Sequence, residues 1–100
     1  MRFLELEGYT VLERNSRHAE VEVDVLARQA TLLVLVEVKL RRYGIVGATE
    51  GLRPLQAQRL RRAARALLVR HPWAEAVRLD VLGLDWREGE LRLSHLRGVG

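Results

Sequence analysis

The chain has 100 residues, of which 48% are hydrophobic and 30% are charged, so we expect a single folded domain over residues 1–100 with one hydrophobic core. The absence of cysteine excludes disulfide bonds, cysteine nucleophiles and thiolate zinc sites, and the longest uninterrupted apolar run, residues 32–36, is far shorter than the roughly 20 residues of a membrane-spanning helix. The formal net charge is +4 and Lys39 is the only lysine among 17 basic residues, which suits a polyanionic partner; we expect a cytoplasmic protein without membrane association.

Hydrophobic periodicity predicts a mixed α/β fold in the order helix, three strands, helix, two strands. The long second helix lets the fourth strand run parallel to an earlier one, while the second and third strands pair antiparallel, so the sheet of about five strands should be mixed. The expected helices cover residues 1–7 and 55–69, and the expected strands cover 9–13, 20–27, 32–40, 77–84 and 90–96. Turns are expected at residues 14–16, 28–31 and 85–89, and a glycine-containing loop at 41–52.

Two adjacent segments carry the clearest strand patterns. Residues 20–25 alternate charged and apolar side chains, which predicts Glu20, Glu22 and Asp24 on one face of a strand and three valines on the other. The nearly unbroken apolar start of residues 32–39 predicts a central strand that is covered on both faces. Charge returns only at the C-terminal end of that strand.

A hairpin between these two strands would gather charged groups on one face. If a four-residue turn closes the hairpin, Glu22 faces Glu37 and Asp24 faces Leu35. Lys39 then lies two residues beyond Glu37 on the same side. Three carboxylates and one ammonium group would therefore converge at one end of the sheet.

Carboxylates packed this closely repel one another, and a hard divalent ion would relieve that repulsion. Mg²⁺, or Mn²⁺ in its place, binds few protein carboxylates and completes its coordination with water and substrate phosphate oxygens. The expected ligands are Asp24, Glu37 and the backbone carbonyl of Val38. The pattern therefore predicts a metal-dependent site that hydrolyses phosphodiester bonds.

The candidate catalytic residues are Asp24, Glu37, Lys39 and Glu22. Lys39 would orient the attacking water or offset charge that develops on the phosphate, and arginine would replace it poorly because its guanidinium is larger and keeps its proton. The competing interpretation is that the Glu-x-Lys tripeptide arises by chance and that its charged side chains meet solvent. The acidic strand that precedes it at hairpin spacing favours the site.

Five segments carry a more specific resemblance. Residues 8–17, 22–27, 35–41, 59–64 and 77–82 resemble the YraN-like family of small bacterial proteins, which are classed as endonucleases of the PD-(D/E)XK superfamily. The resemblance implies a restriction-endonuclease-like core, also found in archaeal Holliday-junction resolvases, with Asp24, Glu37 and Lys39 in the motif positions and Glu22 matching a further acid of the family. It also implies that the nucleic acid is DNA.

Three departures from the family pattern leave a second function open. Val21 stands where the family usually has glycine, Gln56 stands where it usually has lysine, and the first helix is shorter. The leading hypothesis is a metal-dependent nuclease. The alternative is a module of the same fold, with little or no activity, that binds nucleic acid or dimerises; a purely structural partner of other proteins would leave the clustered acids without a purpose.

Arginines near these segments are candidates for nucleic-acid contacts. Six arginines and no acid lie between Arg53 and Arg70, and such a basic surface binds phosphates in a salt-dependent way, although it is also typical of the solvated face of an amphipathic helix. A homodimer is a further expectation, since two copies could act on two strands. The residues expected to bind nucleic acid are Arg41, Arg42, Arg59 and Arg62.

Overall fold

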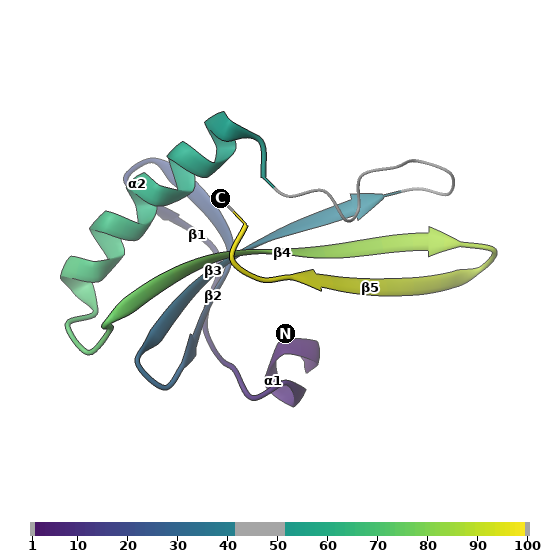
Figure 1. Ribbon diagram of the computed structural model, residues 1–100, viewed down its shortest axis with the longest axis horizontal. Coiled ribbons are helices and arrows are strands. Elements are labelled where there is room, and N and C mark those ends of the chain that lie inside the picture. Colours follow the sequence, from purple (N-terminus) through teal and green to yellow (C-terminus); the bar gives the residue numbers. More distant parts are fainter. Residues whose placement is uncertain (1, 42–51, 100) are drawn as a thin grey trace.

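The computed structural model describes residues 2–41 and 52–99 and contains the seven elements in the order expected from the sequence (Figure 1). The two helices lie close to their predicted bounds, since Gly8, at φ 93°, follows the first and Pro54 begins the second. Neither described helix has the length and hydropathy of a membrane-spanning helix. The elements are α1 (Arg2–Leu6), β1 (Thr10–His18), β2 (Val21–Gln29), β3 (Leu32–Arg41), α2 (Pro54–Arg70), β4 (Ala76–Arg87) and β5 (Glu90–Leu96).

The five strands form one mixed sheet in the order β1-β2-β3-β4-β5. All neighbouring pairs are antiparallel except β3 and β4, which are parallel because α2 carries the chain back across the sheet between them. The prediction of a mixed five-stranded sheet, with an antiparallel second and third strand, is confirmed. The strand that carries Glu37 and Lys39 is therefore the middle strand of the sheet.

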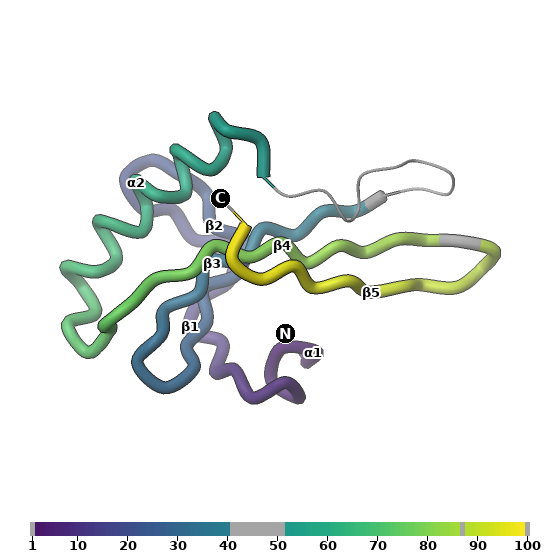
Figure 2. Tube along the Cα trace, in the orientation of Figure 1, coloured from purple at the N-terminus to yellow at the C-terminus, as the bar shows by residue number. Residues whose placement is uncertain are grey.

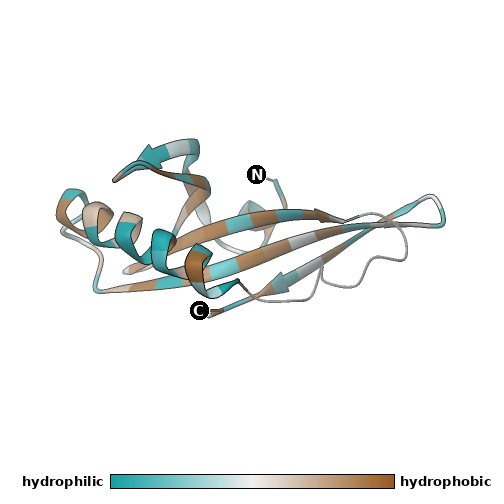
Figure 3. Cartoon of the chain, turned by 90° about the horizontal axis from the view of Figure 1, so that it is seen from above, coloured by the Kyte–Doolittle hydropathy of each residue, from teal (hydrophilic) through white to brown (hydrophobic). Residues whose placement is uncertain are grey.

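Helices cover the two faces of the sheet, α2 on one side and α1 on the other (Figure 1). Alternate residues of β3 enter the two layers: Leu33 and Leu35 pack toward α2, and Val34 and Val36 pack toward α1. Figure 3 shows hydrophobic residues along the strands and alternating hydrophobic and hydrophilic residues along α2. The predicted central strand with both faces covered is confirmed. The α2 cluster comprises Val21, Val23, Leu26, Leu33, Leu35, Leu60, Ala63, Ala64, Leu67 and Leu79, and the α1 cluster comprises Leu4, Tyr9, Val25, Ala27, Val34, Val36 and Leu82.

The register between β2 and β3 differs from the predicted one by two residues. Leu26, rather than Asp24, faces Leu35, because the chain turns within Ala30 and Thr31 instead of a four-residue loop. Ala30 adopts a left-handed φ of 53°, which allows this tight turn. An even shift leaves the side chains of β3 on their predicted faces, and it brings Asp24 closer to Glu37.

The valines of β2 do not share one face, contrary to the sequence prediction. Val21 and Val23 pack in the α2 cluster, whereas Val25 packs in the α1 cluster. The face changes at Asp24, where β2 changes its partners: the residues before it pair only with β1, and those from Val25 to Arg28 pair with both β1 and β3. Asn15 of β1, with a φ of 49°, lies opposite this point. A strand irregularity of this kind re-aims a side chain, here Asp24.

The first strand continues through the polar residues 14–16, which the sequence predicted as a turn. Pairing with β2 resumes after Asn15, so the backbone of these residues stays in the ladder although their side chains are polar. The turn falls instead at Ala19 and Glu20, which both adopt left-handed φ values of 51° and 65°. Glu20, predicted as the first residue of the second strand, is therefore a turn residue.

A hairpin of β4 and β5 extends away from α2 (Figure 2). Its turn is shorter than predicted, because residues 85–87 continue β4 and only Glu88 and Gly89 turn the chain, at φ values of 49° and 77°. Large apolar side chains remain exposed on this hairpin and on the end of β3. They are Leu40, Trp86, Leu91 and Leu93, with exposed fractions of 70%, 52%, 50% and 45%.

Candidate active site

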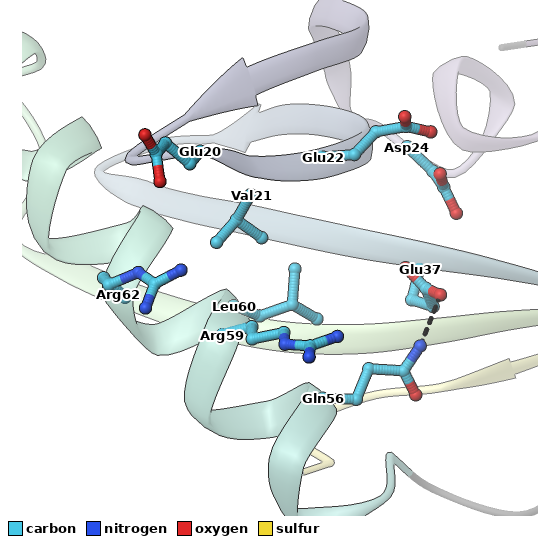
Figure 4. A pocket seen from close by; sticks show the side chains of 9 residues that line it. All are labelled: Glu20, Val21, Glu22, Asp24, Glu37, Gln56, Arg59, Leu60 and Arg62. Carbon is cyan, nitrogen blue, oxygen red and sulfur yellow. Dashed lines mark hydrogen bonds between the residues drawn. The ribbon is translucent and has the colours of Figure 1, made fainter.

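A polar pocket of about 440 Å³ lies between the sheet and the first half of α2 (Figure 4). Acidic side chains line it from β2, from β3 and from the turn before β2, and arginines line it from the helix. It lies where β2 changes its partner strands and where the charged end of β3 begins. Its polar groups therefore come from segments that are far apart in the sequence. The lining residues are Glu20, Val21, Glu22, Asp24, Glu37, Gln56, Arg59, Leu60 and Arg62.

Two carboxylates of this pocket, Asp24 and Glu37, lie close to each other at one side of it (Figure 4). Oδ2 of Asp24 accepts a hydrogen bond from the backbone N–H of Val38 at 2.8 Å, which holds the carboxylate beside β3. The sequence predicted that Asp24 and Glu37 lie close together, and the structure brings them together despite the different register. The hydrogen bond to Val38 is the geometric reason, because it ties the irregular part of β2 to the end of β3.

Gln56 links α2 to the charged end of β3. Its Oε1 accepts a hydrogen bond from Nζ of Lys39 at 2.8 Å, and its Nε2 donates one to Oε2 of Glu37 at 2.7 Å. Nζ of Lys39 lies 3.9 Å from the same Glu37 oxygen. Sequence reasoning noted Gln56 only as a departure from a family pattern. The one sequence feature that could have pointed to these contacts is the position of Gln56 in the first turn of the helix that begins at Pro54.

Glu37 is an acid whose surroundings favour its protonated form. Burial, together with the negative charge of Asp24, raises the pKa of Glu37 from 4.5 to about 7, although the Lys39 ammonium acts in the opposite direction. Its side chain is 18% exposed, so solvent compensates the carboxylate only in part. A perturbed acid in a polar pocket is typical of functional sites, because charge is concentrated there at a cost in stability.

The donor set of this pocket suits a hard divalent ion. The two hydrogen bonds use Oδ2 of Asp24 and Oε2 of Glu37, which leaves the second oxygen of each carboxylate to bind an ion or to share a proton. Within residues 2–41 and 52–99, no three acidic or histidine side chains are grouped to hold a metal. Mg²⁺ often takes only one or two protein carboxylates, so the pair fits such an ion, and coordination by the carbonyl of Val38 stays a prediction.

The other predicted site residues are only partly gathered here. Glu22 is exposed and lines the pocket, and its charge contributes to the raised pKa of Glu37. Arg59 and Arg62 are exposed and line the same pocket from α2. Arg41 is the last residue of β3, and its contact with nucleic acid stays a prediction. Arg42 lies outside the described residues.

The comparison with known proteins places the chain in a family. The family model described as "Uncharacterised protein family UPF0102" matches residues 1–84. The chain belongs to the UPF0102 family. It is 45% identical to a UPF0102 protein of Beutenbergia cavernae, over 99% of this chain and 86% of that protein. UPF0102 proteins of Kineococcus radiotolerans and Streptomyces griseus are each 41% identical, over 99% and 98% of this chain and 84% and 86% of theirs.

This UPF0102 chain has a second polar cluster that sequence reasoning missed. Asp80 is fully buried, and its oxygens accept two hydrogen bonds from Arg78, at 2.8 Å each, one from the backbone N–H of Gly98 and one shared with His95. Burial alone would raise the pKa of Asp80, but these hydrogen bonds and the Arg78 charge hold it below its usual range. The sequence feature that could have indicated this cluster is the pair of opposite charges on Arg78 and Asp80, which lie two residues apart and therefore on one face of a strand. The cluster anchors the C-terminal segment against β4.

Proposed function

We propose that this protein is a metal-dependent nuclease that hydrolyses phosphodiester bonds of nucleic acid. The proposal rests on one observation: Asp24 and Glu37 line one pocket, Lys39 lies next to Glu37, and arginines of α2 line the same pocket. The carboxylates supply metal ligands, Lys39 supplies a fixed cation, and the arginines supply contacts for a polyanion. That the nucleic acid is DNA rests on the resemblance to the YraN-like family.

The polar residues in and beside the pocket would have distinct roles in this mechanism. Asp24 and Glu37 would hold Mg²⁺ or Mn²⁺, with the carbonyl of Val38 as a third ligand. When bound there, the ion would supply Lewis-acid stabilisation of the phosphate charge and promote ionisation of the attacking water. Lys39 orients that water or offsets charge on the phosphate, and the amide of Gln56 fixes the position of its Nζ. Glu22, at the exposed side of the pocket, adds negative charge that favours a divalent cation.

The same proposal extends to the fold. A mixed five-stranded sheet with helices on both faces agrees with the restriction-endonuclease-like core that the YraN-like resemblance implies. The order of the site residues along the chain matches the PD-(D/E)XK motif, with Asp24 on the second strand and with Glu37 and Lys39 on the third. We therefore propose that the chain carries this motif on a core of that type.

A catalytically weak module that binds nucleic acid is the second candidate. It is favoured by the exposed arginines of α2, since phosphate binding by these side chains does not require the carboxylates. Its dimerisation stays a prediction, and the exposed leucines and Trp86 near the β4–β5 hairpin are the residues to substitute when the oligomeric state is measured.

The decisive experiment is a titration with Mg²⁺ or Mn²⁺ of the wild type beside Asp24→Ala and Lys39→Ala, with cleavage assayed on single-stranded, duplex and branched DNA. Glu75→Gln is the matched control, since Glu75 is exposed and does not line the pocket. Metal-dependent cleavage that is lost in both pocket variants and kept in the control supports the nuclease. DNA binding without metal and without cleavage by any variant supports the binding module instead.

A further inference from the structure

A second depression adjoins the carboxylate pocket at the start of α2. It has a volume of about 310 Å³ and shares Gln56 and Arg59 with the first pocket. Among the described residues, no carboxylate lines it, whereas four acids line the first. Its lining residues are Lys39, Arg53, Leu55, Gln56 and Arg59.

Two of the three cations of this depression are not neutralised by the described part of the chain, whereas Nζ of Lys39 lies 3.9 Å from the Glu37 carboxylate. Arg53 and Arg59 are exposed, and neither forms an ion pair with a residue in 2–41 or 52–99. Lys39 gives one hydrogen bond to Gln56, which leaves two of its three N–H donors for another acceptor. Three cationic side chains that share one depression repel each other, and an anion bound between them would relieve that repulsion.

The beginning of α2 adds to the positive potential around these side chains. The 17-residue helix has no acidic residue in its first turn, and the Arg53 side chain makes no capping hydrogen bond. The backbone N–H groups of the first turn therefore keep the partial positive charge of a helix N-terminus. This effect acts in the same direction as the Lys39, Arg53 and Arg59 charges.

We propose that Lys39, Arg53 and Arg59 form a binding subsite for a phosphate of the nucleic-acid backbone next to the one that is cleaved. The proposal rests on the proposed function and assigns the two adjoining depressions to two successive parts of one strand. The carboxylate pocket receives the reacting phosphate, and the basic depression receives its neighbour. Lys39, which lies at 3.9 Å from Glu37 and also lines the basic depression, borders both.

Substrates with and without a neighbouring phosphate should depend differently on this subsite. A polynucleotide carries the neighbouring phosphate, so the subsite contributes to its binding and to its alignment in the carboxylate pocket. A small diester such as bis(p-nitrophenyl) phosphate carries none, so the subsite does nothing for it. Arg53 touches only the neighbouring phosphate in this arrangement, which makes it the residue to substitute.

The test measures binding of a labelled duplex oligonucleotide in EDTA over a range of salt concentrations, for the wild type, Arg53→Gln and Arg53→Lys. Arg70→Gln is the matched control, because Arg70 is exposed on the same helix but lies in its last turn and lines neither depression. Arg53→Gln should lower the slope of log Kd against log salt by about 0.9, the value for one lost phosphate contact on duplex DNA. Arg53→Lys and Arg70→Gln should keep the wild-type slope.

Equal slopes for Arg53→Gln and the wild type would overturn the subsite, whether or not the protein cleaves DNA. Equal losses in Arg53→Gln and Arg70→Gln would also overturn it, since binding would then reflect net charge alone. A slope that depends on Arg53 in a protein without cleavage would support the subsite and refute the nuclease. If cleavage occurs, Arg53→Gln should raise KM for oligonucleotides and leave hydrolysis of bis(p-nitrophenyl) phosphate unchanged.

Discussion

Replacing Glu37 by glutamine should stabilise the protein at neutral and higher pH when no divalent ion is present. Burial and the neighbouring Asp24 raise the pKa of Glu37 from 4.5 to about 7, so the folded state holds this proton more tightly than the unfolded state does. Stability is therefore lost as the pH rises from about 4.5 to about 7. The substituted glutamine would carry no charge and would keep a carbonyl oxygen for the amide of Gln56.

The magnitude follows from the size of the pKa change. At about 1.4 kcal/mol for each pH unit, the interval from 4.5 to about 7 sets an upper limit of about 3.5 kcal/mol on the stability that ionisation of Glu37 removes. The side chain is 18% exposed, so solvent screening reduces the effect. We expect Glu37→Gln to be about 1 to 2 kcal/mol more stable than the wild type at about pH 8.

Urea unfolding of both proteins in EDTA, at several values between about pH 5 and about pH 8, measures this difference. The wild type should lose more stability than Glu37→Gln across that range, and adding Mg²⁺ should restore stability only to the wild type, because a ligand that binds the folded state stabilises it. Parallel pH profiles for the two proteins would refute the argument that the folded state holds an uncompensated carboxylate at this position.

Three further predictions concern other contacts. Asp80→Asn should lower the free energy of unfolding by about 3 to 5 kcal/mol, because Arg78 loses the buried charge that pairs with it; denaturation beside the exposed variant Glu90→Gln measures this, and equal stability of the two would contradict it. Gln56→Leu should shift the pH dependence of cleavage upward, because Glu37 loses a hydrogen bond that favours its charged form; an unchanged profile would show that Gln56 does not tune this acid. Lys39→Arg should not regain the cleavage lost in Lys39→Ala, and full recovery would show that any cation suffices there.

The candidate site was only partly predictable from the sequence. The apolar run before Glu37 and strand periodicity were enough to place Glu37 and Lys39 on one face at the end of β3, whereas Asp24 joins them through a change of face in β2 that the alternation along residues 20–25 did not predict. The contribution of Gln56 was not predictable, since it arrives from a helix whose position depends on packing of the α2 cluster. The basic depression depends on the same packing, because Arg53 and Arg59 meet Lys39 only when the start of α2 lies over the end of β3.

The sequence by itself determined the order of the seven elements, the mixed sheet and the central position of β3, because these follow from local periodicity and from the length of the connection that α2 makes. Only the tertiary structure decided the two-residue turn at Ala30 and Thr31 and the change of face at Asp24. Both depend on which strands pair with β2 along its length. Strand pairing cannot be predicted from a residue's neighbours in the sequence. The position of Asp24 against Val38 is the functional consequence.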